Sequence, residues 1–569
     1  MKYWLLLFTL PLSLFADDAE LKENFSAYFA AETQMLAERC LAEIETKEDW
    51  DAEVDTYRQQ LQYMLGLDPM PERTPLQPVI TGSHEREGIV VENLHFQSSP
   101  GLYVTGNLYR PKTVTDKLPG ILYVCGHGRA VKDGISYGNK THYQHHGAWF
   151  ARNGYVCLVI DTIQLGEIEG IHHGTYKYKM WWWNTRGYTP AGVEAWNGMR
   201  AIDYLQSRPE VDGERIGVTG RSGGGAYSWW IAALDQRVKC AVPVAGITSL
   251  KNHVVDGCIE GHCDCMYMVN SHRWDFAQVA ALVAPRPLLI SNTDKDSIFP
   301  LDGVVDVYTK TKRIYDLLGA SNKIGLHITE GPHKDTQELR VHAFRWLNRW
   351  LKNDDSLITI PAEPLFTLEE LRVFKELPAD EIVTRIHETF VPRAEPGEIG
   401  TTEHLAFLKQ HCFKAWSETS PVRHPLAPGL FELRDHANTE VLHILTDWIV
   451  TLKPMSARLE SLDERYLTHL RRRHALLGQS LEGQVLQEYI RQLTELSKRQ
   501  PIQEITASGN EAIAALLVVL YGPEVQRVEL SNMPDNLDDG PTYLNLARHT
   551  TLAELKKMAS AKTELVIKP

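Results

Sequence analysis

The strongest chemical signal in the sequence is the run Gly220-Arg221-Ser222-Gly223-Gly224. It directly follows a short apolar run, Arg215 to Thr219, and precedes the helix-forming segment Ala226 to Leu234. A serine between a strand and a helix is typical of a nucleophile elbow, a sharp turn that exposes the hydroxyl. Glycines flank it because side chains there would collide with neighbouring backbones. We therefore predict that Ser222 is a nucleophile and that the N–H of Gly223 stabilises an oxyanion.

A serine hydroxyl is a poor nucleophile without a base, and the base needs an acid to orient it. In proteins with such an elbow, the acid and then a histidine follow the serine along the chain. Pro287 to Ser291 has the pattern of a buried strand, and the loop behind it contains Asp294 and Asp296. Asp296 is the preferred acid because it stands four residues before Pro300, and Asp294 is the alternative.

The predicted base is His333, in the loop Glu330-Gly331-Pro332-His333. This loop follows the next strand pattern, Lys323 to Thr329, so it lies at the same edge of a parallel sheet as the acid loop. His327 falls inside that strand and His342 on the following helix, and we expect structural roles for both.

A second oxyanion donor is expected from the loop Cys125-Gly126-His127-Gly128-Arg129, which follows another apolar run. Its glycines allow the backbone to approach a substrate oxygen. The backbone N–H of Gly128 or Arg129 is the predicted donor, and both stay open. His127 is expected to brace the loop.

Substrate contacts are predicted for Arg221, Trp182 and Trp183. The two tryptophans belong to an aromatic segment that follows a strand on the catalytic side of the predicted sheet. Large aromatic rings on a loop can stack on sugar rings, or they can cap the core, and both interpretations stay open.

Three of the eight cysteines crowd one loop: Cys258, Cys263 and Cys265. A local disulfide is expected there if the protein reaches an oxidising compartment. A zinc site that uses His262 is the alternative, although the spacing fits no standard zinc-finger pattern. We predict no metal and no cofactor.

These side chains need a sheet to position them, and the chain contains alternating strand and helix patterns. Strands are expected at 88–96, 103–109, 118–124, 155–160, 215–219, 238–244, 287–291 and 323–329, and helices at 145–152, 191–206 and 341–352. The continuous apolar runs among them indicate strands buried on both faces. The repeated order predicts an α/β fold with a doubly wound, mostly parallel sheet.

Four segments follow from the composition and from the breaks between patterned regions. Residues 1–16, with Lys2 ahead of a short apolar run, are read as a cleavable signal peptide, and an uncleaved anchor is the alternative. Residues 17–84 are a helical lead-in, 85–352 the catalytic domain, and 353–569 a helix-rich, non-catalytic C-terminal α/β domain. The signal peptide predicts a secreted or periplasmic protein.

The C-terminal domain contains a segment that is similar in sequence to the elbow. Ile505-Thr506-Ala507-Ser508-Gly509-Asn510 aligns with Val218 to Gly223, and the position of the nucleophile then falls on Gly509. This region is interpreted as a degenerate hydrolase-like half without its serine, or as a plain α/β packing module.

The overall composition excludes several function classes. Hydrophobic residues make up 43% of the 569 residues, enough for a sizeable core, and the formal net charge is −14. An acidic surface repels phosphate backbones, so nucleic-acid binding is not expected. No segment after the first sixteen residues is apolar for long enough to span a bilayer, so stable membrane insertion is not expected either.

With these residues in place, 90–352 resembles the acetyl xylan esterase-like branch of the α/β-hydrolase superfamily, close to dienelactone-hydrolase-like esterases. The matching motifs are Gly126-His127-Gly128, Trp196 to Leu205, Val211-Asp212, Ser222 to Gly225, Ala284 to Ile290 and Gly331-Pro332-His333. The sequence departs from the family at Thr293, where glycine is common, in its cysteine-rich insert and in its long C-terminal region.

The resemblance implies a Ser-His-Asp serine esterase that deacetylates a polysaccharide or oligosaccharide through an acyl-enzyme. Glucuronoyl esterases are also similar, but they usually place an arginine just after the nucleophile, where this chain has Gly223. A serine peptidase of the prolyl-oligopeptidase type shares the elbow, but its usual propeller repeats are not visible. A binding protein with a vestigial hydrolase core is disfavoured by the intact set of catalytic residue types.

Overall fold

The computed structural model describes residues 18–395, 397, 401–418, 422–426, 431–434, 448–453, 455, 459 and 462–569. The predicted signal peptide, residues 1–16, lies outside the described residues. Within them, no helix has the length and apolar character needed to cross a membrane.

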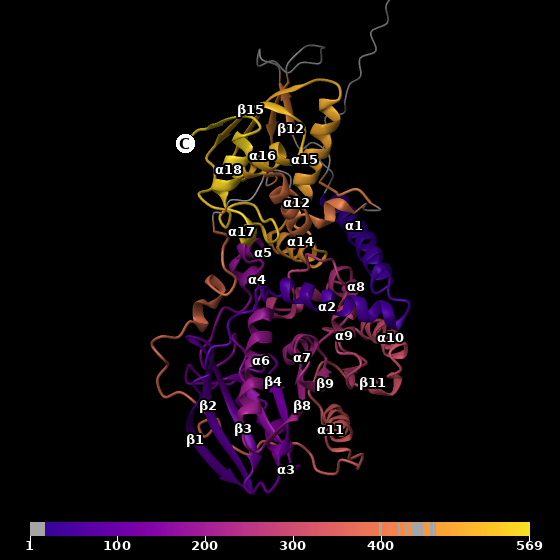
Figure 1. Cartoon of the computed structure of the whole chain (residues 1–569), viewed down its shortest axis with the longest axis vertical. Helices are drawn as coiled ribbons and strands as arrows, with labels where there is room; N and C mark the ends of the chain where they lie inside the picture. The colour runs from indigo at the N-terminus through magenta and orange to yellow at the C-terminus, as the bar shows by residue number, and fades with distance from the viewer. Residues whose placement is uncertain are drawn as a thin grey trace, which may run out of the picture. The chain divides into compact units, whose positions relative to one another are not determined.

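The chain divides into two compact units (Figure 1). The large unit comprises Thr33–Pro392 and Ala475–Gly478, and the small unit comprises Met1–Glu32, Arg393–His474 and Gln479–Pro569. The large unit extends beyond the predicted 85–352 at both ends. The reason is packing: α2 (Lys47–Met64) contacts α7 (Gly223–Leu234), and Phe366 and Leu371 join the hydrophobic core.

A nine-stranded sheet organises the large unit, in the order β1-β2-β3-β7-β4-β8-β9-β10-β11. The strands are β1 (Val79–Arg86), β2 (Ile89–Ser99), β3 (Leu102–Pro111), β4 (Leu118–Val124), β7 (Val156–Ile160), β8 (Val211–Arg221), β9 (Val238–Val244), β10 (Leu288–Thr293) and β11 (Ile324–Thr329). Pairing is antiparallel from β1 to β7 and parallel from β7 to β11. The predicted mostly parallel sheet is thus confirmed.

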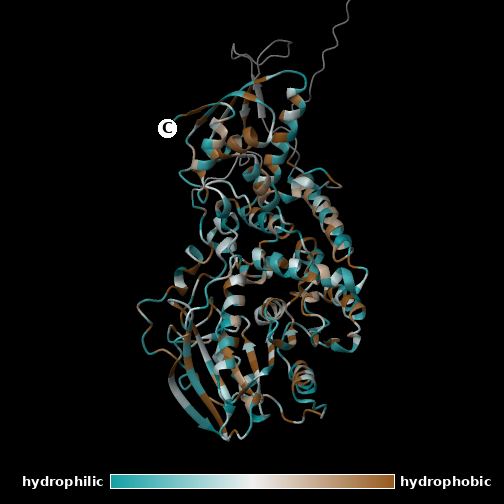
Figure 2. Cartoon of the chain, in the orientation of Figure 1, coloured by the Kyte–Doolittle hydropathy of each residue, from teal (hydrophilic) through white to brown (hydrophobic). Residues whose placement is uncertain are grey.

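The central strands are where the sequence is most hydrophobic (Figure 2). Every residue of β7 is buried, as are all but one of β4 and of β9, because helices cover both faces of the sheet. The edge strand β1 is mostly exposed. It lacks the alternation of a half-buried strand, and sequence analysis missed it for that reason.

Helices α3 (Gln144–Arg152) and α11 (Gln337–Lys352) pack on one face, where the Trp149 and Phe344 rings stack with centroids 3.7 Å apart. Helices α6 (Pro190–Ser207) and α7 pack together elsewhere on the sheet, with Gly198 of α6 tight against Ile231 of α7. The remaining helices of this unit are α4 (Gly174–Tyr178), α5 (Trp182–Arg186), α8 (Leu250–Val254), α9 (Phe276–Ala281) and α10 (Leu301–Leu317).

The small unit has its own five-stranded sheet, in the order β12-β13-β14-β15-β16. The strands are β12 (Phe431–Arg434), β13 (Trp448–Leu452), β14 (Ile502–Ser508), β15 (Val525–Ser531) and β16 (Glu564–Ile567), and only β12 pairs antiparallel. Helix α16 (Asn510–Tyr521) packs against β14, α15 (Leu481–Ser497) and α18 (Leu552–Ser560). The predicted C-terminal α/β region is therefore present.

Candidate active site

Ser222 stands at the junction of β8 and α7 with φ 60° and ψ −120°. Few residues other than glycine adopt a positive φ, and such strain concentrates at functional sites. The N–H of Ser222 donates to the carbonyl oxygen of Val244, at the end of the neighbouring strand β9, over 2.9 Å. This bond holds the turn at the carboxyl edge of the sheet and leaves the Ser222 side chain partly exposed.

Two glycines allow this turn because the strand beside it passes very close. A Cβ atom on Gly220 would lie 2.3 Å from the carbonyl oxygen of Val124, and one on Gly224 would lie 2.1 Å from the same oxygen. Atoms at such distances overlap, so no side chain fits at either position. The glycine pattern in the sequence thus has a steric cause.

The structure brings Ser222, His333 and Asp296 together. The Nε2 atom of His333 lies 2.9 Å from the Oγ atom of Ser222, and its Nδ1 atom lies 2.7 Å from Oδ2 of Asp296. The three residues follow β8, β11 and β10, whose carboxyl ends open on one edge of the sheet. The arrangement leaves a lone pair of His333 directed at the serine hydroxyl, as general-base chemistry requires.

Asp296 is fully buried and anchored through both oxygens. Its Oδ1 atom accepts hydrogen bonds from the N–H groups of Ile298 and Phe299, each 2.9 Å long. Its Oδ2 atom is therefore left for the imidazole of His333. The alternative acid, Asp294, is exposed and instead accepts a 2.8 Å bond from the N–H of Gly331.

The oxyanion loop meets the turn, but one of its predicted donors is already in use. The N–H of Gly128 donates to the hydroxyl of Tyr143 over 3.2 Å. In this geometry the N–H of Gly128 is already bound within the protein, and Arg129 stays a predicted donor.

His127 borders the serine turn directly. A Cβ atom on Gly223 would lie 2.7 Å from the Nε2 atom of His127. Burial, helped by nearby histidines, lowers the pKa of His127 to about 3, so the imidazole is neutral at physiological pH. Its Nε2 atom lies 3.4 Å from Sγ of Cys263 and 3.3 Å from Sγ of Cys265, and those two sulfurs form a disulfide.

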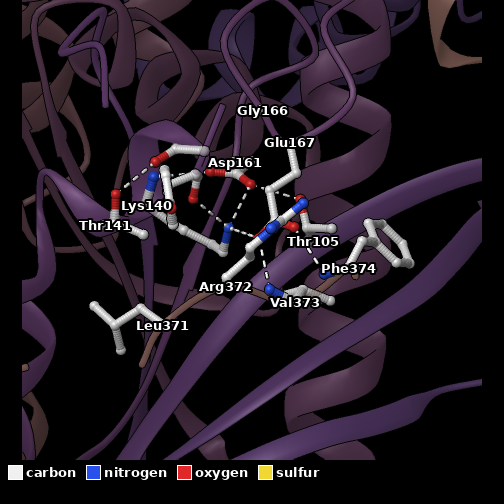
Figure 3. A network of polar contacts seen from close by, with 12 residues as sticks. Thr105, Lys140, Thr141, Asp161, Gly166, Glu167, Leu371, Arg372, Val373 and Phe374 are labelled. Carbon is white, nitrogen blue, oxygen red and sulfur yellow. Dashed lines mark hydrogen bonds and ion pairs between the residues drawn. The ribbon is translucent and has the colours of Figure 1, made fainter. Parts of the chain in front are cut away.

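Sequence reasoning missed a buried ionic network that supports the oxyanion loop (Figure 3). The fully buried Nζ atom of Lys140 lies 2.9 Å from Oδ2 of Asp161 and 2.6 Å from Oε1 of Glu167. Burial acts to lower the pKa of Lys140, but the two carboxylates outweigh it and raise that pKa overall. The adjacent Asn139 donates a 2.7 Å bond to the carbonyl oxygen of Gly126.

The same network fastens a distant segment. Glu167 accepts hydrogen bonds from the N–H groups of Val373 and Phe374, 2.7 and 2.8 Å long. Residues far apart in sequence thus converge around the side chains of Lys140 and Glu167 (Figure 3). A lysine and two acids spread over this distance carry no recognisable spacing, and the available signal was that Asp161 directly follows an apolar run.

The three residues predicted to contact substrate lie in different surroundings. Trp183 is 1% exposed, with its ring against Gly174, so it packs in the core and offers no surface to a ligand. Trp182 is partly exposed, and the guanidinium of Arg186 lies 4.4 Å from its ring centroid.

Arg221 is 8% exposed and lines a small internal cavity with His146 and Asp335. Its Nε and Nη2 atoms are buried without a hydrogen-bond partner. The side chain is therefore held under the turn, and the geometry gives no support to a substrate contact.

Known proteins similar in sequence to this chain include hydrolases and peptidases. Residues 101–265 match the model of the X-Pro dipeptidyl-peptidase (S15) family. The chain is 27% identical over 301 residues to the Bacillus subtilis protein described as "Putative hydrolase YtaP". The aligned region covers 52% of this chain and 98% of that protein. The chain is 24% identical over 236 residues to the "Uncharacterized peptidase YuxL" of the same organism, 40% of this chain and 33% of that one.

Solved structures of esterases match part of the chain. A structure titled "Methylesterase BT1017" is 24% identical in sequence, has a TM-score of 0.48, and covers 62% of this chain and 77% of its own. A glucuronoyl esterase from Solibacter usitatus is 16% identical with a TM-score of 0.42, over 54% of this chain and 94% of its own.

Proposed function

We propose that this protein, a hydrolase of the α/β-hydrolase superfamily, is a serine esterase that removes acyl groups, above all acetyl groups, from a polysaccharide or oligosaccharide. The observation that carries the proposal is the hydrogen-bonded chain from Ser222 through His333 to Asp296, with links of 2.9 and 2.7 Å. Such a chain activates a hydroxyl for attack on an acyl carbon.

In the proposed reaction, His333 Nε2 takes the proton of Ser222 as Oγ attacks the ester carbonyl carbon. Asp296 keeps the Nδ1–H of His333 in place and stabilises the imidazolium that forms. The N–H of Gly223, with a donor from the 126–129 loop, stabilises the oxyanion. The imidazolium then protonates the departing alcohol. Water enters by the reverse sequence, releases the acid and restores Ser222.

The substrate class rests on the family resemblance and on the predicted signal peptide. The resemblance to acetyl xylan esterases favours acyl groups on plant or algal polysaccharides. A signal peptide at 1–16 would take the enzyme to the periplasm or the medium, where polymeric substrates are found. Recovery of the protein outside the cytoplasm with Asp17 as its first residue would support this part, and an intact Met1 there would contradict it.

A serine dipeptidyl-peptidase is the second candidate, and the family match over 101–265 favours it. In that case Ser222, with His333 as its base, would attack an amide carbonyl. The esterase and the peptidase would differ in how they bind their substrates. Glucuronoyl esterase activity is a third outcome of the same experiment.

The experiment is a substrate panel with the wild-type chain and the Ser222→Ala variant. The panel contains acetylated xylan, a methyl glucuronate ester, p-nitrophenyl acetate and Ala-Pro-p-nitroanilide. We expect release of acetate from xylan by the wild type only. Turnover of the anilide with no ester hydrolysis would replace the esterase proposal with the peptidase.

A further inference from the structure

Three potential metal ligands meet beside the acid loop, outside the set of residues assigned to the reaction. His253 comes from α8, Cys258 opens the short helical turn Cys258–Gly261, and His262 follows that turn. One ligand atom from each lies within 4.8 Å of the other two. The rings of His253 and His262 are buried, with 2% and 1% exposure.

The spacing of the Cys258 and His253 ligand atoms suits a tetrahedral ion. The Sγ atom of Cys258 lies 3.5 Å from Nδ1 of His253. A zinc ion bound at about 2.3 Å to sulfur and about 2.05 Å to nitrogen separates those two ligand atoms by about 3.6 Å. A donor set of one thiolate and two imidazoles binds zinc in preference to calcium or magnesium, which prefer oxygen ligands.

His262 is held in the orientation that a metal ligand requires. Its Nε2 atom lies 2.9 Å from the carbonyl oxygen of Ile298, an acceptor only. Nε2 must therefore carry the hydrogen, which leaves Nδ1 with its lone pair for a metal. A backbone carbonyl that fixes the tautomer of a ligating histidine is the usual companion of a metal site.

Cys258 is available for coordination. Cys263 and Cys265 are joined to each other, and Cys258 is a free thiol with partial exposure.

We propose that His253, Cys258 and His262 bind one zinc ion, with solvent water in the fourth position. The thiol of Cys258 gives its proton to solvent as the zinc–sulfur bond forms. The ion would tie both ends and the middle of the loop 253–262 together.

The ion would act as a positioning element for the triad. Through His262 it holds Ile298, whose N–H donates to Oδ1 of Asp296. The other oxygen of Asp296 receives His333. Zinc thus touches no reacting atom, but it restrains the loop that sets the orientation of the acid.

The test begins with metal content. The full chain is dialysed against zinc chloride, freed of excess and analysed by mass spectrometry of the metal. We expect about one zinc per wild-type chain and less than a tenth of that in Cys258→Ser and in His262→Ala. The control is the double variant Cys263→Ser/Cys265→Ser, which is expected to keep its zinc.

Two results would overturn the proposal. The first is a wild-type chain with no bound zinc after loading. The second is loss of zinc in the double variant with retention in Cys258→Ser, which would move the site to His127 and the Cys263–Cys265 pair.

A measurement on the wild type avoids any doubt about the folding of variants. Cobalt replaces zinc after chelation, and a thiolate ligand gives an intense sulfur-to-cobalt charge-transfer band in the near ultraviolet. We expect that band together with the strong visible absorption of tetrahedral cobalt. A spectrum of octahedral cobalt without the band would exclude Cys258 as a ligand.

The positioning role has its own signature. Zinc removal is expected to lower kcat on p-nitrophenyl acetate several-fold with little change in KM, and added zinc should restore it. An unchanged kcat in the metal-free enzyme would reduce the ion to a structural one, while the metal analyses decide the site independently of any esterase activity.

Discussion

The large and small units contain the same backbone turn, but among the described residues only the turn of the large unit is met by a histidine and an acid. Ser222 has φ 60° and ψ −120°, and Gly509 has φ 64° and ψ −133°. Each ends a parallel strand and begins a helix of 12 residues. Each also donates its N–H to the last residue of the next strand, Val244 at 2.9 Å and Ser531 at 3.0 Å.

The surroundings of the two turns differ. A Cβ atom on Gly509 would meet nothing within 4 Å, and the turn borders a cavity of about 660 Å³ whose described lining residues include no histidine. Ser508 accepts a bond from Asn532 at 3.1 Å. His549, the one histidine that follows β15, packs against the rings of Phe407 and His411.

The comparison teaches that the elbow is a property of the strand–turn–helix backbone, whereas catalysis is a property of the loops that meet it. The large unit delivers an acid and a base to its turn from two further parallel strands. Among the described residues, the small unit repeats the turn without such an acid and base, so a serine there would have no described base to activate it.

The sharpest way to break this comparison is to remove the serine of each turn. Ser222→Ala should lower ester hydrolysis by about 10⁶, because the nucleophile is lost. Ser508→Ala should leave the rate within twofold of wild type. Steady-state kinetics on p-nitrophenyl acetate, with circular dichroism to verify folding, decides between them. Equal losses in the two variants would mean that both turns are catalytic.

The next largest effect concerns the acid. Asp296→Asn should lower kcat by about 10⁴, since an amide favours the wrong tautomer of His333. Asp294→Asn should lower it less than tenfold, because Asp294 bonds to Gly331 instead. If the ranking is reversed in the same kinetic assay, the acid is Asp294 and the loop geometry changes during turnover.

Glycine substitutions test how tightly each turn is packed. Gly224→Ala should destabilise the protein by more than about 2 kcal/mol, because the new methyl group overlaps the Val124 carbonyl. The methyl group of Gly509→Ala would meet open space, so the only expected loss of stability is that of the positive φ, about 1 kcal/mol. Chemical denaturation followed by far-ultraviolet circular dichroism compares them, and a more severe effect at Gly509 would contradict the steric account.

A final difference between the two units concerns how their stability depends on pH. Burial raises the pKa of Glu194, in the large unit, to about 8, while the net effect of Arg491 and its neighbours, against burial, lowers the pKa of Glu488 in the small unit. The Glu194 contribution is present below pH 4.5 and is lost as pH rises through 8, by about 1.4 kcal/mol per unit. That of Glu488 is lost as pH falls below 4.5.

Calorimetry between pH 5 and 9 tests this sign. Glu194→Gln should flatten the decline of the unfolding temperature toward alkaline pH, because the amide has no proton to lose. Glu488→Gln is the control and should leave that decline unchanged. A decline that persists unaltered in Glu194→Gln would assign it to other groups.

Local sequence determined the buried strands of the large sheet, the elbow and the order of the candidate catalytic residues. Apolar runs such as 118–124 and 238–244 coincide with β4 and β9, because a strand buried on both faces needs a continuous hydrophobic stretch. The loops with Asp296 and His333 could be placed for a related reason. Parallel strands end at one edge, so residues just past them converge whatever the intervening chain does.

Only the tertiary structure decided what each side chain touches. Burial of Trp183, confinement of Arg221 under the turn and use of the Gly128 N–H by Tyr143 all depend on segments distant in sequence. The same holds for Lys140 with its two acids. His253, Cys258 and His262 are close in sequence, but the approach of their ligand atoms is set by the fold of that loop. Periodicity reports which face of an element is buried, but contacts between loops are set by packing in three dimensions, which no local pattern encodes.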